Sequence, residues 1–200
     1  MRALTRLMIA ALGALSLAAC SGGGGGGAPN PMGVIGRADA PVEVIEYASM
    51  SCPHCADFNN EEFPKLKAKY IDTGKVRWEL REMLTPPNNL SAAGFMLARC
   101  AGKDRYMTVI DTMYHNLRDI YPNQREGLLN IARAMGMTEA EFVKCIDNKE
   151  EADALSARVK KNVPKVPSGT PTFWVDGKIH KGAASAAELE KLIDAALAKK

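Results

Sequence analysis

The chain has 200 residues, and its 26 basic and 23 acidic residues leave a formal net charge of +3 at pH 7. The basic residues form no stripe with interleaved aromatic residues, so the composition argues against nucleic acid as a partner. The length and the 46% hydrophobic content predict one globular domain, or a small domain with an insertion.

Residues 1–19 have the pattern of a secretory signal peptide. Arg2 and Arg6 supply the positive charge, and the apolar stretch 7–17 is too short for a membrane span. Leu17-Ala18-Ala19-Cys20 resembles a bacterial lipoprotein cleavage box, which predicts a lipid on Cys20 and a protein anchored to a membrane in the bacterial periplasm. The alternative is ordinary cleavage near Ala19, with Cys20 incidental.

Residues 20–33 are predicted to form a flexible tether. They contain six consecutive glycines, Gly22 to Gly27, and such a run holds no fixed conformation. The fold is therefore expected to begin near residue 34.

The motif Cys52-Pro53-His54-Cys55 follows a strand predicted over residues 40–48 and opens a helix that ends near Tyr70, with a kink expected at Pro64. A thiol at the start of a helix lies in the positive end of the helix dipole, which lowers its pKa below the ordinary value of about 8.5. The pattern predicts thiol–disulfide exchange, which needs no metal and no organic cofactor.

Half of a zinc site is the alternative for this motif. Zinc would require a second cysteine pair or well-spaced histidines, whereas Cys100 and Cys145 are solitary and the three histidines are scattered. With Cys52 and Cys55 paired by proximity, Cys100 pairs with Cys145 if it pairs at all. Two buried free thiols remain the alternative for that second pair.

The rest of the chain alternates between strand and helix patterns. A strand is predicted over 76–84, and the helical spacing of apolar residues predicts helices over 91–101, 104–117, 124–135, 138 onward and 150–162. Ser91 is interpreted as a helix cap and Thr138 as the start of a capping box. Strands return at 172–175 and 178–180 around an Asp176-Gly177 turn, and a helix over 185–197 closes the chain. The methionines are expected in the core, with a soft peptide-binding surface as the alternative.

This order of elements, together with Cys52-Pro53-His54-Cys55 and Gly169-Thr170-Pro171-Thr172-Phe173, resembles the DsbA-like branch of the thioredoxin superfamily. The resemblance implies an α/β, thioredoxin-like fold with an inserted α-helical domain. Its two parts would be residues 34–86 and 150–200, and the helical insertion would be residues 87–149.

The resemblance also implies a role for each site residue. Cys52 would be the nucleophile that forms a mixed disulfide, Cys55 the resolving thiol, and His54 a stabiliser of the Cys52 thiolate. Pro171 would be cis and would place the Thr170 backbone beside Cys52, where an extended substrate can pair with it. Glu46 would be a buried acid that serves proton transfer at Cys55, unless it points to solvent.

The implied function is an exported thiol:disulfide oxidoreductase that acts on unfolded or reduced polypeptides. It would be reoxidised by a DsbB-like, quinone-linked membrane partner, and a monomer is expected. Threonine before Pro171 is also seen in the isomerase branch, so a disulfide isomerase or reductase on the same fold remains open. A lipid-anchored, non-catalytic chaperone is the third hypothesis.

Overall fold

The computed structural model describes residues 27–167, 169–182 and 184–200. The predicted signal peptide, Cys20 and most of the glycine run lie outside the described residues. Residues 28–33, which the sequence placed in the tether, are packed against the domain: Ala28 and Asn30 are buried, and Pro31–Gly33 forms a 3-10 turn, η1. In the described part of the chain, no helix is both long and apolar enough to span a bilayer.

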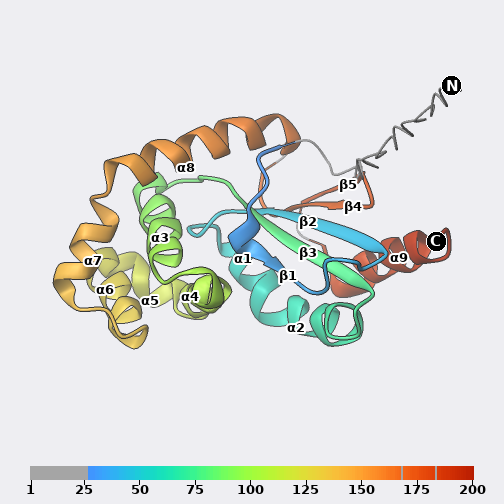
Figure 1. Ribbon diagram of the computed structural model, residues 1–200, viewed down its shortest axis with the longest axis horizontal. Coiled ribbons are helices and arrows are strands. Elements are labelled where there is room, and N and C mark those ends of the chain that lie inside the picture. Colours follow the sequence, from blue (N-terminus) through green and yellow to red (C-terminus); the bar gives the residue numbers. More distant parts are fainter. Residues whose placement is uncertain (1–26, 168, 183) are drawn as a thin grey trace, which may run out of the picture.

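A mixed sheet forms the centre of the molecule, with the strand order β1-β3-β2-β4-β5 (Figure 1). Its strands are β1 (Val34–Ile35), β2 (Val42–Ala48), β3 (Val76–Glu82), β4 (Thr172–Val175) and β5 (Lys178–Lys181). β2 and β3 pair in parallel, and the other neighbours pair antiparallel. The two-residue β1 was not predicted, because so short a strand cannot show the alternation of apolar and polar residues that indicates a strand.

The helix after the cysteine motif differs from the expected single helix with a proline kink. It consists of α1 (Pro53–Asp57), a π-helical turn η2 (Phe58–Glu62), α2 (Phe63–Leu66) and a second π-helical turn η3 (Lys67–Ile71). Pro64 has no N–H to bond to the carbonyl four residues earlier, and the first wide turn lies directly before it.

The helical insertion lies beside one end of the sheet (Figure 1). Its elements are α3 (Asn88–Cys100), α4 (Lys103–His115), α5 (Leu117–Ile120), η4 (Tyr121–Asn123), α6 (Gln124–Ala134) and α7 (Glu139–Ile146). The long α8 (Lys149–Asn162) and the short η5 (Val163–Lys165) lead back to the sheet, and α9 (Ala186–Leu197) ends the fold.

The predicted caps had different outcomes. Thr138 opens α7 with a capping box to Glu141, as predicted. The prediction that Ser91 caps a helix is wrong, because α3 begins three residues earlier at Asn88. Ser91 is instead buried inside α3, where its hydroxyl contacts the loop that precedes Cys52.

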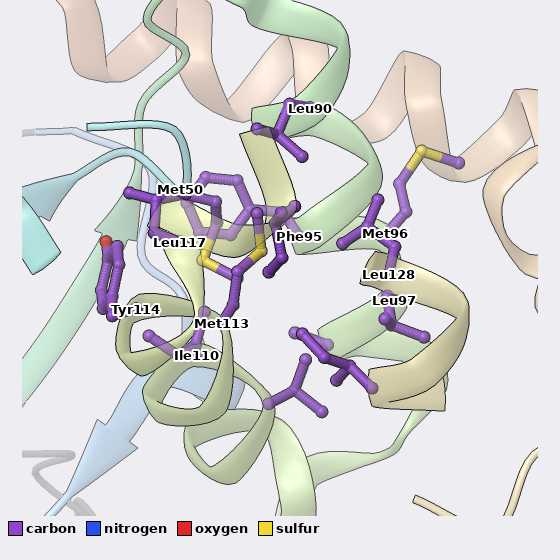
Figure 2. Packing of buried hydrophobic residues seen from close by; sticks show 14 of the residues in the cluster. Met50, Leu90, Phe95, Met96, Leu97, Ile110, Met113, Tyr114, Leu117 and Leu128 are labelled. Carbon is purple, nitrogen blue, oxygen red and sulfur yellow. The ribbon is translucent and has the colours of Figure 1, made fainter. Parts of the chain in front are cut away.

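Two main apolar clusters make up the core. One lies between the insertion and the loop that precedes Cys52, where Met50, Phe95 and Met113 lie together (Figure 2). The other lies between the sheet, the helical segment 53–71 and α9, and includes Tyr70, Trp78 and Phe173. Met50, Met83 and Met96 are all buried, so they belong to the core and form no exposed peptide-binding surface.

Candidate active site

The active-site loop connects the end of β2 to the start of α1. Cys52 is the N-cap residue of α1, and its sulfur accepts a hydrogen bond from the Cys55 backbone N–H at 3.4 Å. Pro53 fits the first helical position because the N–H that it lacks would have no partner there. The local sequence therefore places the first sulfur at the positive end of the helix.

Cys52 has an acidic thiol. Both cysteines of the motif are reduced in this structure, and Cys52 is 7% exposed. A hydrogen bond from the Cys55 thiol is the largest influence that lowers the pKa of Cys52, from 9.0 to about 6, against the opposing effect of burial. The backbone N–H groups of Cys55 and His54 act in the same direction. Cys52 is therefore largely a thiolate at neutral pH.

Cys55 has the opposite character. Its side chain is completely buried, and this burial raises the pKa of the Cys55 thiol well above its ordinary value. The neighbouring Cys52 sulfur and the charge of Glu46 act in the same direction. The site thus pairs an ionised sulfur near the surface with a protonated sulfur beneath it.

Glu46 lies on β2 and is buried, so the alternative that it points to solvent is wrong. Burial raises the pKa of Glu46 from 4.5 to about 8, and the negative charge of Cys52 acts in the same direction. The Trp78 indole N–H donates to a carboxyl oxygen of Glu46 at 3.2 Å and opposes part of that shift. A carboxyl with this pKa can hold or release a proton near neutral pH.

The Thr170–Pro171 peptide bond is cis, as the sequence predicted. The Cys52 thiol lies 3.3 Å from the Thr170 carbonyl oxygen and donates to it in its protonated form. The Thr170 hydroxyl oxygen is the one buried side-chain polar atom of the described residues without a hydrogen-bond partner. His54 is exposed on α1 and contributes its backbone N–H to the environment of Cys52.

The insertion supplies two tyrosines that the sequence reasoning missed. The Tyr114 hydroxyl donates to the Ser49 carbonyl oxygen at 3.1 Å, and the Tyr121 hydroxyl donates to the Ser51 carbonyl oxygen. Tyr114 was read only as one of the apolar positions of its helix. Its spacing shows that it faces the core, and nothing in that pattern shows what its hydroxyl reaches.

A group of buried hydroxyls supports the same loop from below. The Ser49 hydroxyl lies 2.8 Å from the Ser91 hydroxyl of α3 and accepts the Thr85 backbone N–H at 3.1 Å. The Ser51 hydroxyl donates to the Thr85 carbonyl oxygen at 2.7 Å. The insertion and the end of β3 therefore hold the loop that presents Cys52.

A hollow of about 430 Å³ opens beside Pro53, between the active-site helix and the insertion. The buried side chains of Ala56, Tyr114 and Leu117 contribute to its lining, and Tyr121 lies at its edge toward the active-site loop. Among the residues that the structure describes, no group of three or more His, Cys, Asp or Glu side chains is placed to hold a metal ion.

Cys100 and Cys145 form a disulfide that joins α3 to α7, with their Cα atoms 6.2 Å apart. The alternative of two free thiols is therefore wrong for this structure. Cys145 is buried, whereas Cys100 is exposed. The bond closes a loop within the insertion and takes no part in the geometry around Cys52.

Comparison with known proteins gives consistent matches. The family model described as thioredoxin matches residues 29–195. A candidate protein-disulfide oxidoreductase of Rickettsia conorii is 36% identical over 169 residues, which cover 82% of this chain and 60% of the relative. Disulfide bond formation protein D of Bacillus subtilis is 26% identical over 80% of this chain and 75% of its own length.

Among solved structures, alpha-DsbA1 of Wolbachia pipientis superposes with a TM-score of 0.76 and 26% identity, covering 84% of this chain and 91% of that one. The chain spans only about 60% of the length of the rickettsial relative.

Proposed function

This chain belongs to the thioredoxin family, within its DsbA-like branch, and we propose that it is an exported thiol:disulfide oxidoreductase that donates the Cys52–Cys55 disulfide to folding polypeptides. The contrast between the two sulfurs is the observation that carries the proposal. Cys52 has a pKa of about 6 and lies near the surface, whereas Cys55 is completely buried with a raised pKa.

The proposed reaction has two exchanges. A substrate thiolate attacks the Cys52 sulfur of the oxidised protein, a substrate–Cys52 disulfide forms, and Cys55 leaves and takes up a proton. A second substrate thiolate then attacks the substrate sulfur of this mixed disulfide. The substrate leaves with a new disulfide, and the protein keeps both electrons as the Cys52 thiolate and the Cys55 thiol.

The acidity of Cys52 favours this direction of transfer. The lower pKa stabilises the reduced protein by on the order of 1 kcal/mol at pH 7, which corresponds to a few tens of mV of reduction potential. A low pKa also makes Cys52 a good leaving group in the second exchange. The stabilisation is present above pH 6 and is lost as the pH falls through that value.

The neighbouring groups have proposed roles in the same reaction. The Thr170 backbone, held beside Cys52, pairs with an extended segment of the substrate. Glu46 exchanges a proton with Cys55, because its pKa of about 8 suits a group that works at neutral pH. His54 adds to the stabilisation of the Cys52 thiolate through its backbone N–H.

The location and the partners follow from the sequence features. The signal-like residues 1–19 support export to the bacterial periplasm, and Cys20 is the proposed lipid attachment site. A donor of disulfides must be reoxidised after each cycle, and we assign this step to a DsbB-like, quinone-linked membrane protein. The helical insertion is proposed to span residues 87–149.

A disulfide isomerase or reductase is the second candidate, and Thr170 before the cis-proline favours it. Two assays separate the candidates: oxidation of a reduced peptide with two thiols, and refolding of scrambled ribonuclease. An oxidase oxidises one equivalent of the peptide per equivalent of its own disulfide, and it refolds scrambled ribonuclease poorly. A reduction potential near that of thioredoxin, about −270 mV, would contradict the oxidase.

A further inference from the structure

Two large apolar side chains are exposed in the described part of the chain. Val163 of η5 is 54% exposed, and Ile179 of β5 is 38% exposed. Ile179 lies directly opposite Trp174 in the β4–β5 pair, and the Trp174 indole N–H donates to the Lys165 carbonyl oxygen at 3.2 Å. Trp174 therefore connects η5, which carries Val163, to the hairpin, which carries Ile179.

Three lysines flank Val163 along the chain. Lys160 and Lys161 at the end of α8 are exposed, and no described residue forms an ion pair with either. The Lys165 ammonium lies 5.8 Å from the centre of the Trp174 ring. Lys160, Lys161, Val163, Lys165 and Ile179 are called the Val163 surface below.

Acidic side chains do not neutralise this surface. The carboxylates of α8 occur near its opposite end, at Glu150, Glu151 and Asp153. Asp176, in the β4–β5 turn, is paired with Lys200. Lysines in the last turn of a helix favour its dipole, but that effect gives no reason for the exposed Val163 and Ile179 beside them.

The N-terminal segment joins the fold at this surface. The Ala28 backbone N–H donates to the Asn162 side-chain oxygen at 2.8 Å, and Asn162 directly precedes Val163. Gly27 approaches so closely that a Cβ there would lie 3.0 Å from the same oxygen. The described chain accordingly starts beside the end of α8 (Figure 1).

The distance from this point to Cys20 is short. Residues 20–27 span at most about 25 Å when fully extended. A lipid on Cys20, which belongs to the proposed function, would therefore keep the Val163 surface within that distance of the bilayer. Exposed apolar residues with adjacent lysines are the combination that binds an anionic membrane surface.

We propose that the Val163 surface docks on a bilayer that contains anionic phospholipids. Val163 and Ile179 contact the boundary between headgroups and acyl chains, and the lysines contact the phosphates. The loop that carries Thr170 and Pro171 follows η5 directly, so docking also holds Cys52 near the bilayer, where a membrane reoxidase works.

The two tryptophans provide a direct probe. Trp78 is fully buried, whereas Trp174 is partly exposed beside Lys165 and Ile179 of the Val163 surface. The exported protein, in the form that cells process it, is mixed with phosphatidylcholine vesicles that carry brominated acyl chains, with or without phosphatidylglycerol. We expect quenching of Trp174 on the anionic vesicles, little on the neutral ones, and loss of quenching at high salt. A Trp174→Phe variant assigns the signal.

A matched pair of variants tests the lysines. Lys160→Gln/Lys161→Gln should lower the docking constant on anionic vesicles about 25-fold, because each lysine near such a surface contributes about fivefold. Lys103→Gln/Lys144→Gln removes the same charge from exposed sites on α4 and α7 and should leave docking unchanged.

Equal quenching on neutral and anionic vesicles would overturn the proposal, and so would equal losses in the two variants. Oxidation of a soluble reduced peptide is measured on the same samples. If the samples keep this activity but show either of these two outcomes, only the proposed membrane docking is refuted. If the activity is absent from all samples, the proposed function itself is refuted.

Discussion

Replacing Glu46 by glutamine tests whether a buried carboxyl controls the stability of the active site. Glu46 is buried, and its pKa of about 8 lies well above its ordinary value of 4.5. Between these two values the folded protein holds a proton that the unfolded chain releases. The free energy of unfolding therefore falls as the pH rises from 4.5 to 8.

The shift corresponds to about 5 kcal/mol in total, and about two thirds of it develops by pH 7. A glutamine side chain at this position cannot ionise, and its carbonyl oxygen can still accept the Trp78 N–H. The stability of Glu46→Gln relative to wild type should thus rise by about 4 kcal/mol between pH 4.5 and pH 8. The amide N–H₂ group of glutamine can also change the free energy of unfolding, but this contribution is the same at every pH.

Urea unfolding at several pH values, with reductant present to keep the cysteines free, measures this difference. Glu43→Gln is a suitable control on the same strand. Glu43 forms a partly exposed ion pair with Arg77, and the loss of such a pair removes at most about 1 kcal/mol. A difference between Glu46→Gln and wild type that stays constant from pH 4.5 to pH 8 would refute the reasoning.

Three further outcomes are expected from the structure. Asn30→Ala should lower the free energy of unfolding by about 3 kcal/mol in urea, because it leaves three hydrogen bonds unmade, two of them buried and one partly buried; a loss below about 1 kcal/mol would contradict this. Cys100→Ala/Cys145→Ala should lower it by about 4 kcal/mol, the entropy of a 45-residue loop, with no change in the reduction potential of the active site. Tyr121→Phe removes the hydroxyl bonded to the Ser51 carbonyl and should cost about 1 kcal/mol, with faster backbone hydrogen exchange in that loop; unchanged exchange would argue against the contact.

The main elements of the fold could be predicted because local patterns determine them. The alternation of residues 40–48 and 76–84 marked β2 and β3, and the capping residues Thr138 and Ser185 lie at the starts of α7 and α9. The Cys52 motif was placed at a helix N-terminus by sequence order alone, and the structure has it there.

Contacts between distant segments could not be predicted in this way. Asn30 appeared to belong to a tether, yet it is buried and bonded to Leu80, Arg99 and Tyr106. Ser91 looked like a helix cap because serine favours that position, but its actual partner is Ser49, 42 residues away. Such partners depend on how the insertion packs on the sheet, which no local window contains.

The same distinction between local patterns and distant contacts applies to the candidate site. The residue types and spacing of the motif indicated both cysteines, and the resemblance to the DsbA-like branch implied the cis-proline. The two tyrosines that hold the loop come from the insertion. The acidity of Cys52 was predicted from its helix position. The structure adds the Cys55 thiol as the largest cause, which required the two sulfurs to be placed relative to each other.

The pKa of the Cys52 thiol is the quantity on which the account depends most directly. The rate at which iodoacetamide alkylates the reduced protein, followed by mass spectrometry of Cys52 against pH, gives this value. The account predicts a midpoint near pH 6 and little reaction at the buried Cys55. A midpoint near 9, the value of an unperturbed cysteine, would contradict it.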